Sequence, residues 1–236
     1  HGPHGGPPEL LMVQRAREMR FAGGAAVFPG GRIDPADHVL AGIVAPGADP
    51  DITAARIAGI RETLEETGLA IALRSPVSAA EAAEARRRLI AEGALAPVLE
   101  RFGWSLDLDR LVPFARWCPM VDRAFDARFF LTDLGTGAVE VAVDATENTR
   151  LFWASATEAL RLADAGEIEI IFPTRRNLER LALFDSFAAA CTQAEAIPVR
   201  MITPRAVERD GERWLTIPEG HGYPVTSQNM ATVRRG

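Results

Sequence analysis

Hydrophobic and polar residues follow a strand-like spacing near the start of this chain and a helical spacing from Ile52 onward. Two short apolar runs, Glu9–Gln14 and Gly24–Phe28, are expected to be strands, and the second ends at a turn formed by Pro29-Gly30-Gly31. The next residues are rich in Asp, Pro and Gly. We therefore expect a loop from Arg32 to Asp51.

A helix is predicted from Ile52 to Thr67. Three apolar residues share one face of it: Ile57, Ile60 and Leu64. Gly68 follows, at a position where glycine commonly ends a helix in the left-handed conformation. The apolar run after this glycine, Leu69–Leu73, is predicted to be a strand.

The rest of the chain alternates between further helices and strands. Helices are expected at Ser78–Ala91, where Ser78 and Glu81 form a capping box, and at Leu95–Phe102, Ser155–Ala165 and Thr174–Gln193. Strands are expected at Leu111–Cys118, Phe125–Asp133, Glu140–Val143 and Thr149–Trp153, with two short pieces around Met201 and Trp214. This order favours a mixed α/β or α+β sheet over a repeating βαβ array. We expect one domain, 1–236, with insertions at about 32–51 and 75–110.

The composition is that of an ordinary folded protein, with 47% hydrophobic and 25% charged residues. A formal charge of -6 argues against general nucleic-acid binding, which normally needs a basic face. No lysine occurs, which excludes a catalytic lysine. The distant cysteines, Cys118 and Cys191, indicate neither a zinc site nor disulfides, and no apolar run is long enough to span a membrane. We expect a cytoplasmic protein that binds neither nucleic acid nor membrane.

The segment Arg61-Glu62-Thr63-Leu64-Glu65-Glu66-Thr67-Gly68-Leu69 is the most informative part of the chain. At about 100° per residue, its three glutamates lie on one helical face, away from the apolar stripe. Like charges at these spacings repel one another and weaken the helix unless a cation lies among them. Hard oxygen ligands suit Mg²⁺ or Mn²⁺. The alternative is a solvated surface with an Arg61–Glu65 ion pair, and in either case Glu65 and Glu66 are expected to be exposed.

This segment matches REUxEExGU, the core of the Nudix box, with Thr63 at a usually aliphatic position. Phe28-Pro29-Gly30-Gly31 matches the turn that lies beside this helix in the same family. The chain therefore resembles the Nudix hydrolases, which implies an α/β fold, the Nudix α/β/α sandwich with a mixed sheet and helical insertions. The resemblance also implies a site: Glu62, Glu65, Glu66 and the carbonyl of Gly30 as metal ligands, Arg61 to orient a glutamate, and Gly31 in substrate binding.

The chain departs from the full Nudix box, Gx5Ex7REUxEExGU, in its spacing. Starting from Gly31, the pattern would place the arginine at position 45, whereas it stands at 61, so sixteen residues are inserted. Counting back from Arg61 places Thr53 where the first glutamate belongs. Loss of that glutamate removes a common outer metal ligand but leaves the three central carboxylates.

Both insertions and the later run RFFL resemble the acyl-coenzyme A diphosphatase branch of the family. The pattern Arg20-x3-Gly24-x3-FPGG matches the second half of a motif associated with coenzyme A hydrolases. This implies that Arg20 binds the 3′-phosphate of coenzyme A, the alternative being an exposed loop arginine. A further catalytic carboxylate outside the box is expected at Glu147, with Asp144 and Glu140 as competitors.

These motifs predict a Mg²⁺- or Mn²⁺-dependent hydrolase of a small nucleotide substrate. The expected substrate is coenzyme A or acyl-coenzyme A, cleaved to 3′,5′-ADP and 4′-phosphopantetheine or its acyl form. Two alternatives stay open. One is hydrolysis of ADP-ribose, NADH or a nucleotide sugar, and the other is a non-catalytic Nudix module that binds a nucleotide, which the Thr53 departure favours. A homodimer also stays open.

Overall fold

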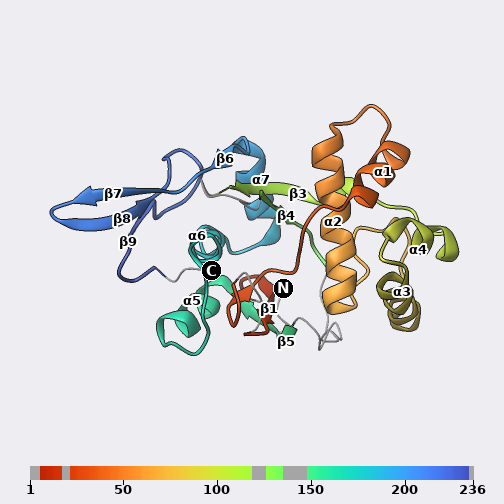
Figure 1. The fold of residues 1–236 in the computed structure, drawn as a ribbon, viewed down its shortest axis with the longest axis horizontal. Coiled ribbons are helices and arrows are strands. Elements are labelled where there is room, and N and C mark those ends of the chain that lie inside the picture. The colour runs from red at the N-terminus through yellow and green to blue at the C-terminus, as the bar shows by residue number, and fades with distance from the viewer. Residues whose placement is uncertain (1–5, 18–21, 119–125, 135–147, 234–236) are drawn as a thin grey trace.

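Helices cover both faces of the central strands (Figure 1). The computed structural model describes residues 6–17, 22–118, 126–134 and 148–233. The strands are β1 (Glu9–Arg15), β2 (Ala26–Val27), β3 (Val112–Trp117), β4 (Ala127–Leu131), β5 (Asn148–Ser155), β6 (Met201–Ile202), β7 (Arg205–Arg209), β8 (Glu212–Thr216) and β9 (Ser227–Asn229). The helices are α1 (Pro35–Val44), α2 (Pro50–Thr67), α3 (Ala79–Glu92), α4 (Leu95–Phe102), α5 (Ala156–Asp164), α6 (Phe172–Leu181) and α7 (Phe187–Ala196), with a 3₁₀ turn, η1, at Leu108–Arg110.

The described strands form three sheets of three strands each. In the first, with the order β2-β1-β5, β1 is antiparallel to both neighbours. In the second, with the order β4-β3-β6, β3 is antiparallel to β4 and parallel to β6, so the pairing is mixed. The third, β7-β8-β9, is antiparallel throughout and extends away from α2 at the left of Figure 1.

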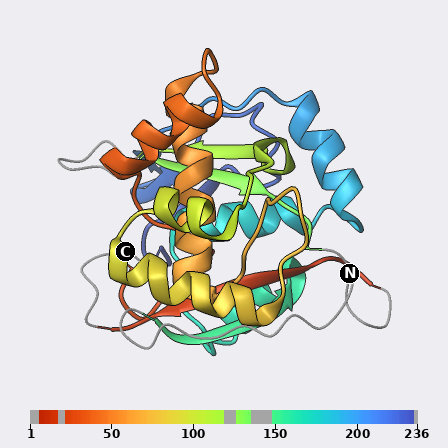
Figure 2. The same cartoon turned by 90° about the vertical axis from the view of Figure 1, so that its right-hand side faces the viewer.

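Successive side chains of β1 point to different helices, as expected of a strand between two helical layers. Met12 is buried in a cluster with Leu178 of α6. Leu11 packs against a second cluster, which contains Ile57 and Leu64 of α2. α2 and α6 therefore cover opposite faces of the strands, and Figures 1 and 2 show α1, α3 and α4 grouped around α2. This arrangement is the α/β/α sandwich.

The prediction of a loop from Arg32 to Asp51 was wrong, because this segment contains α1 and the start of α2. Asp34 and Asp49 are the N-cap residues of the two helices, and Pro35 and Pro50 occupy the first helical positions. Proline is favoured there, because the first N–H groups of a helix have no intrahelical acceptor. The Asp-Pro pairs thus begin helices in this chain.

The prediction of a strand at Leu69–Leu73 was also wrong. Its one described pairing is an isolated bridge between Leu73 and Leu106, and Ala72 has a φ of 51°, which interrupts an extended backbone. Leu69, Ile71 and Leu73 are all buried in the cluster around α2, α3 and α4. The apolar run therefore reflects burial among helices and not strand pairing.

The predicted helix Thr174–Gln193 is divided into α6 and α7. Ser186 caps α7, since its side chain accepts a hydrogen bond from the N–H of Ala189. The strand expected at Gly24–Phe28 is limited to β2, and the tail forms β6 to β9 in place of two short pieces. The capping box at Ser78 and Glu81 is present and begins α3. The expected strand Glu140–Val143 lies outside the described residues.

Candidate functional site

Helix α2 carries three glutamates in its last two turns. Its apolar stripe, Ile57, Ile60 and Leu64, is almost fully buried, and Gly68 ends the helix with a φ of 77°. The glutamates, Glu62, Glu65 and Glu66, therefore lie at the end of the helix where the backbone dipole is negative. Cations are needed to offset this concentration of negative charge.

The glycine turn, residues 28–31, lies against this acidic face. The N–H of Gly30 donates a hydrogen bond of 2.9 Å to Oε2 of Glu66, which is 36 positions further along the chain. At Gly31, an added Cβ would collide with the carboxylate of Glu62. Glycine is therefore required for this close approach, and the two motifs form one site.

Arg61 connects two of the glutamates. It is 4% exposed, and its Nη1 donates to Oε1 of Glu62 at 2.9 Å and to Oε2 of Glu65 at 3.5 Å. Burial disfavours the charged guanidinium, but the hydrogen bond with Asp37 and the charges of Glu62, Asp37 and Asp34 outweigh burial and hold the pKa of Arg61 above its ordinary value. The arginine is therefore a fixed cation beside the acidic face.

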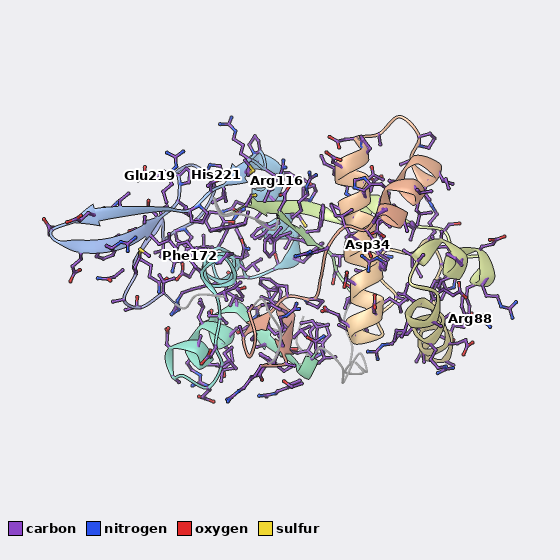
Figure 3. The ribbon with its side chains drawn as sticks, viewed as in Figure 1. Asp34, Arg88, Arg116, Phe172, Glu219 and His221 are labelled. Carbon is purple, nitrogen blue, oxygen red and sulfur yellow. The ribbon has the colours of Figure 1, made fainter. Side chains whose placement is uncertain are left out.

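Asp37 of α1 is a partner of Arg61 that the sequence analysis missed. It is 1% exposed, and its two oxygens accept hydrogen bonds from Nε and Nη2 of Arg61 at 3.2 and 3.1 Å. Asp34, beside α2 in Figure 3, also pairs with Nη2, at 3.3 Å. Five residues separate Gly31 from Asp37, as Gx5E requires, so this part of the Nudix box spacing is present, with Asp in place of Glu. The inserted residues follow it, and Thr53, the position reached by counting backward, is buried in the first turn of α2.

Glu66 is 5% exposed, so the prediction of an exposed side chain was wrong for this residue. Besides the hydrogen bond from Gly30, its Oε1 accepts one of 3.4 Å from Nδ2 of Asn148, a buried residue at the start of β5. Asn148 was not predicted, because a single asparagine at a strand end has no distinctive spacing. Glu65 is partly exposed.

The surroundings of Glu62 disfavour its negative charge. Burial raises the pKa of Glu62 to about 7, with a further contribution from the charges of Glu66 and Glu65, although Arg61 opposes this shift. A carboxylate in such surroundings gains from an additional cation nearby. The electrostatics of the site therefore favour cation binding.

The oxygen donors of this site fit a hard divalent ion. Within the described part of the chain, no three His, Cys, Asp or Glu side chains form a ready-made metal cage. Mg²⁺ does not need one, because it keeps several waters and is usually held by one or two carboxylates and substrate phosphates. The residues that could hold it are those that the resemblance implied: Glu62, Glu65, Glu66 and the carbonyl of Gly30.

Two other predicted site residues, Arg20 and Glu147, lie outside the described residues. The same holds for the competitors of Glu147, Asp144 and Glu140. The roles suggested for all four therefore rest on the sequence.

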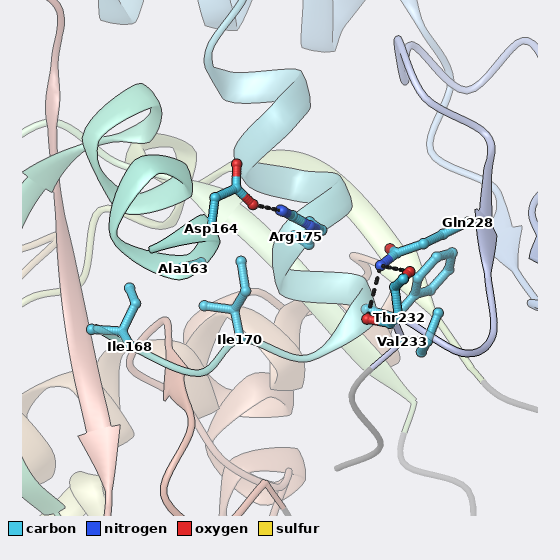
Figure 4. A pocket seen from close by; sticks show the side chains of 9 residues that line it. Ala163, Asp164, Ile168, Ile170, Arg175, Gln228, Thr232 and Val233 are labelled. Atoms are coloured by element: carbon cyan, nitrogen blue, oxygen red, sulfur yellow. Dashed lines mark hydrogen bonds and ion pairs between the residues drawn. The ribbon is translucent and has the colours of Figure 1, made fainter. Parts of the chain in front are cut away.

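A separate cavity of about 290 Å³ lies between α5, α6 and the C-terminal segment (Figure 4). The ion pair of Asp164 and Arg175 lies at one side, and Gln228, which donates hydrogen bonds to Thr232, lies at the other. None of its described lining residues comes from α2 or from the glycine turn. This cavity is therefore distinct from the acidic site.

Known proteins resemble this chain in both sequence and fold. The acyl-coenzyme A diphosphatase NUDT19 of Gallus gallus is 27% identical over 234 residues, an alignment that covers 75% of this chain and 62% of that protein. The crystal structure of a NUDIX hydrolase from Alicyclobacillus acidocaldarius matches with a TM-score of 0.65 and 29% identity, over 78% of this chain and 87% of that one. No family model matches the chain.

The fold and the paired motifs are similar to those of the Nudix hydrolases. Within the superfamily it resembles the acyl-coenzyme A diphosphatase branch. The chain spans 62% of the length of the curated relative that it matches. In the part of the chain that the structure describes, no helix is both long and apolar enough to cross a membrane.

Proposed function

We propose that this protein is a metal-dependent hydrolase that cleaves the phosphoanhydride bond of a nucleoside diphosphate linked to another group, with coenzyme A or acyl-coenzyme A as its substrate. The observation that carries the proposal is the contact between the glycine turn and the acidic face of α2, with Arg61 buried beside the glutamates. The similarity to hydrolases of the same superfamily supports it.

In this proposal, the residues of the acidic face have two roles: they hold a divalent ion, and one of them accepts a proton. Arg61 orients Glu62, and the Gly30 N–H and the Asn148 amide orient Glu66. These carboxylates, with Glu65 and the Gly30 carbonyl, would hold Mg²⁺ or Mn²⁺, which neutralises phosphate charge and makes a bound water more acidic. One of the carboxylates accepts the proton of the attacking water.

Asp37 also bears on the choice between an enzyme and a non-catalytic nucleotide-binding module. The single feature that favoured such a module was the absence of a glutamate at Thr53. Because the buried Asp37 pairs with Arg61, an acidic residue stands at the expected spacing after Gly31. The support for a non-catalytic module is thereby removed, and the enzymatic function is the one we retain.

The preference for coenzyme A rests on the branch similarity and on Arg20. A charge-assisted hydrogen bond to the 3′-phosphate is worth about 1.5–3 kcal/mol, which corresponds to roughly a tenfold to hundredfold preference over substrates that lack this phosphate. Hydrolysis of coenzyme A would release 3′,5′-ADP and 4′-phosphopantetheine. A cytoplasmic location is also a proposal, and so is a homodimer. Both are to be measured directly.

A turnover screen tests the proposal. Coenzyme A, 3′-dephospho-coenzyme A, ADP-ribose, NADH and ADP-glucose are each incubated with the protein and Mg²⁺, and the products are separated by chromatography. We expect the fastest release from coenzyme A, and Glu65→Gln should lower it by orders of magnitude. Arg20→Ala should slow hydrolysis of coenzyme A while sparing 3′-dephospho-coenzyme A. A preference for ADP-ribose or NADH would refute the substrate, and binding without turnover of any substrate would favour the non-catalytic module.

A further inference from the structure

The C-terminal end of α2 needs hydrogen-bond donors and positive charge. The last four carbonyls of an α-helix have no donor within the helix. Here the Gly68 N–H bonds the carbonyl of Leu64, and the Leu69 N–H turns to the hydroxyl of Thr67. The last turn of α2 itself contains no basic residue, although three glutamates lie in its last two turns.

Arg86 of α3 supplies donors to two of these carbonyls. Its Nε donates to the carbonyl of Glu65 at 2.9 Å, and its Nη2 donates to the carbonyl of Glu66 at 3.3 Å. One planar guanidinium thus holds the backbone of both glutamates. Its positive charge also lies at the negative end of the helix dipole, where a cation is stabilising.

The packing and the N-terminal cap of α3 hold Arg86 in this position. Ala82, Ala85 and Leu89 are buried on the side facing α2 and α4, and the capping box of Ser78 and Glu81 fixes the first turn. Figure 2 shows α3 and α4 packed beside α2. The neighbouring Arg87, by contrast, has a side chain that is 67% exposed and pairs with Glu84 of its own helix, while Arg88 lies on the outer part of α3 in Figure 3.

We propose that Arg86 is a positioning residue of the candidate active site, and that the helical insertion serves the reaction by holding the last turn of α2. This rests on the proposed function. Arg86 fixes the backbone of Glu65 and Glu66, so that the Glu66 carboxylate is held at the glycine turn and the Glu65 carboxylate beside Arg61 before substrate arrives. Side chains that orient metal ligands in this way typically contribute about ten- to hundredfold in affinity or activity.

The position of Arg86 allows its charge and its hydrogen bonds to be distinguished. If Arg86 acted through charge alone, its removal would relieve repulsion of a divalent ion, and less metal would be needed for half-maximal activity. If it acts by holding the backbone, its removal disorders the ligands, and more metal is needed. The two effects have opposite signs in one titration.

The experiment compares Arg86→Met, Arg86→Lys and the control Arg87→Met in the full chain. We measure kcat, the Mg²⁺ concentration for half-maximal activity, the shift of the thermal midpoint on adding Mn²⁺, and amide hydrogen exchange of residues 64–68 without metal. Arg86→Met should lower kcat about tenfold or more, raise the metal requirement, reduce the Mn²⁺ shift and speed exchange. Arg86→Lys keeps the positive charge but lacks the planar guanidinium that donates to two carbonyls, so its kcat should fall several-fold. Arg87→Met should match the wild type.

Three outcomes would overturn the proposal. A lower metal requirement in Arg86→Met would assign the effect to charge. A lower thermal midpoint with unchanged kcat and metal dependence would make Arg86 a helix cap only. Wild-type behaviour of Arg86→Lys would show that the planar guanidinium is not needed. This variant decides the question if Arg86→Met does not fold. A wild type without any turnover refutes the proposed function instead, and the Mn²⁺ shift and amide exchange then still judge Arg86.

Discussion

Replacing Asp37 by asparagine tests whether α1 holds Arg61 in place. The change keeps the shape of the side chain but leaves a buried guanidinium beside a neutral group. Breaking one side of a buried ion pair costs about 3–5 kcal/mol. We expect the lower end, about 3 kcal/mol, because Arg61 keeps its hydrogen bonds to Glu62 and to the carbonyl of Arg32 at 2.9 and 2.8 Å. Turnover should fall about ten- to hundredfold, since the guanidinium that orients Glu62 is no longer held.

Urea denaturation measures the change in the free energy of unfolding, and initial rates with coenzyme A measure the change in turnover. Asp34→Asn is the matched control, because Asp34 pairs with the same Nη2 of Arg61 but its side chain is 50% exposed. An exposed pair contributes less than about 1 kcal/mol, and asparagine remains a good N-cap for α1. Equal losses in the two variants would refute the reasoning, because burial of the pair would then make no difference.

The remaining predictions concern the glycine turn, the carboxylate outside the Nudix box and the metal. Gly31→Ala should lower kcat by roughly a hundredfold, because the added methyl group displaces the carboxylate of Glu62. The control is Gly42→Ala in α1, where the new Cβ meets open space, and it should leave kcat unchanged. Equal kinetics of the two variants would contradict the contact between Gly31 and Glu62. Glu147→Gln should reduce kcat far more than Glu140→Gln, and small, equal losses would shift the assignment to Asp144. EDTA should abolish turnover and lower the thermal midpoint measured by calorimetry, and Mg²⁺ should restore both; a midpoint indifferent to Mg²⁺ would argue against a bound ion.

The acidic helix and the glycine turn could be predicted from the amino-acid sequence, because their signals are local. The stripe of Ile57, Ile60 and Leu64 repeats at helical spacing, and Gly68 is suited to the left-handed conformation that ends the helix. The Phe28–Gly31 motif is complete within four residues. Such signals depend on neighbours a few positions away, and both motifs occur in the structure as predicted, in contact with each other.

The side chains that support this helix, and the apolar runs that pair as strands, became known only from contacts between elements that lie far apart in the sequence. The Asp37–Arg61 contact joins residues 24 positions apart, and the contacts of Arg86 with α2 join residues about 20 apart. Neither follows from spacing within a single element. Leu69–Leu73 has the composition of a strand, yet it is buried among helices. The cause is the same in each case: hydrophobic burial has no preferred direction, so the packing of whole elements determines where a buried segment lies and which charges meet there.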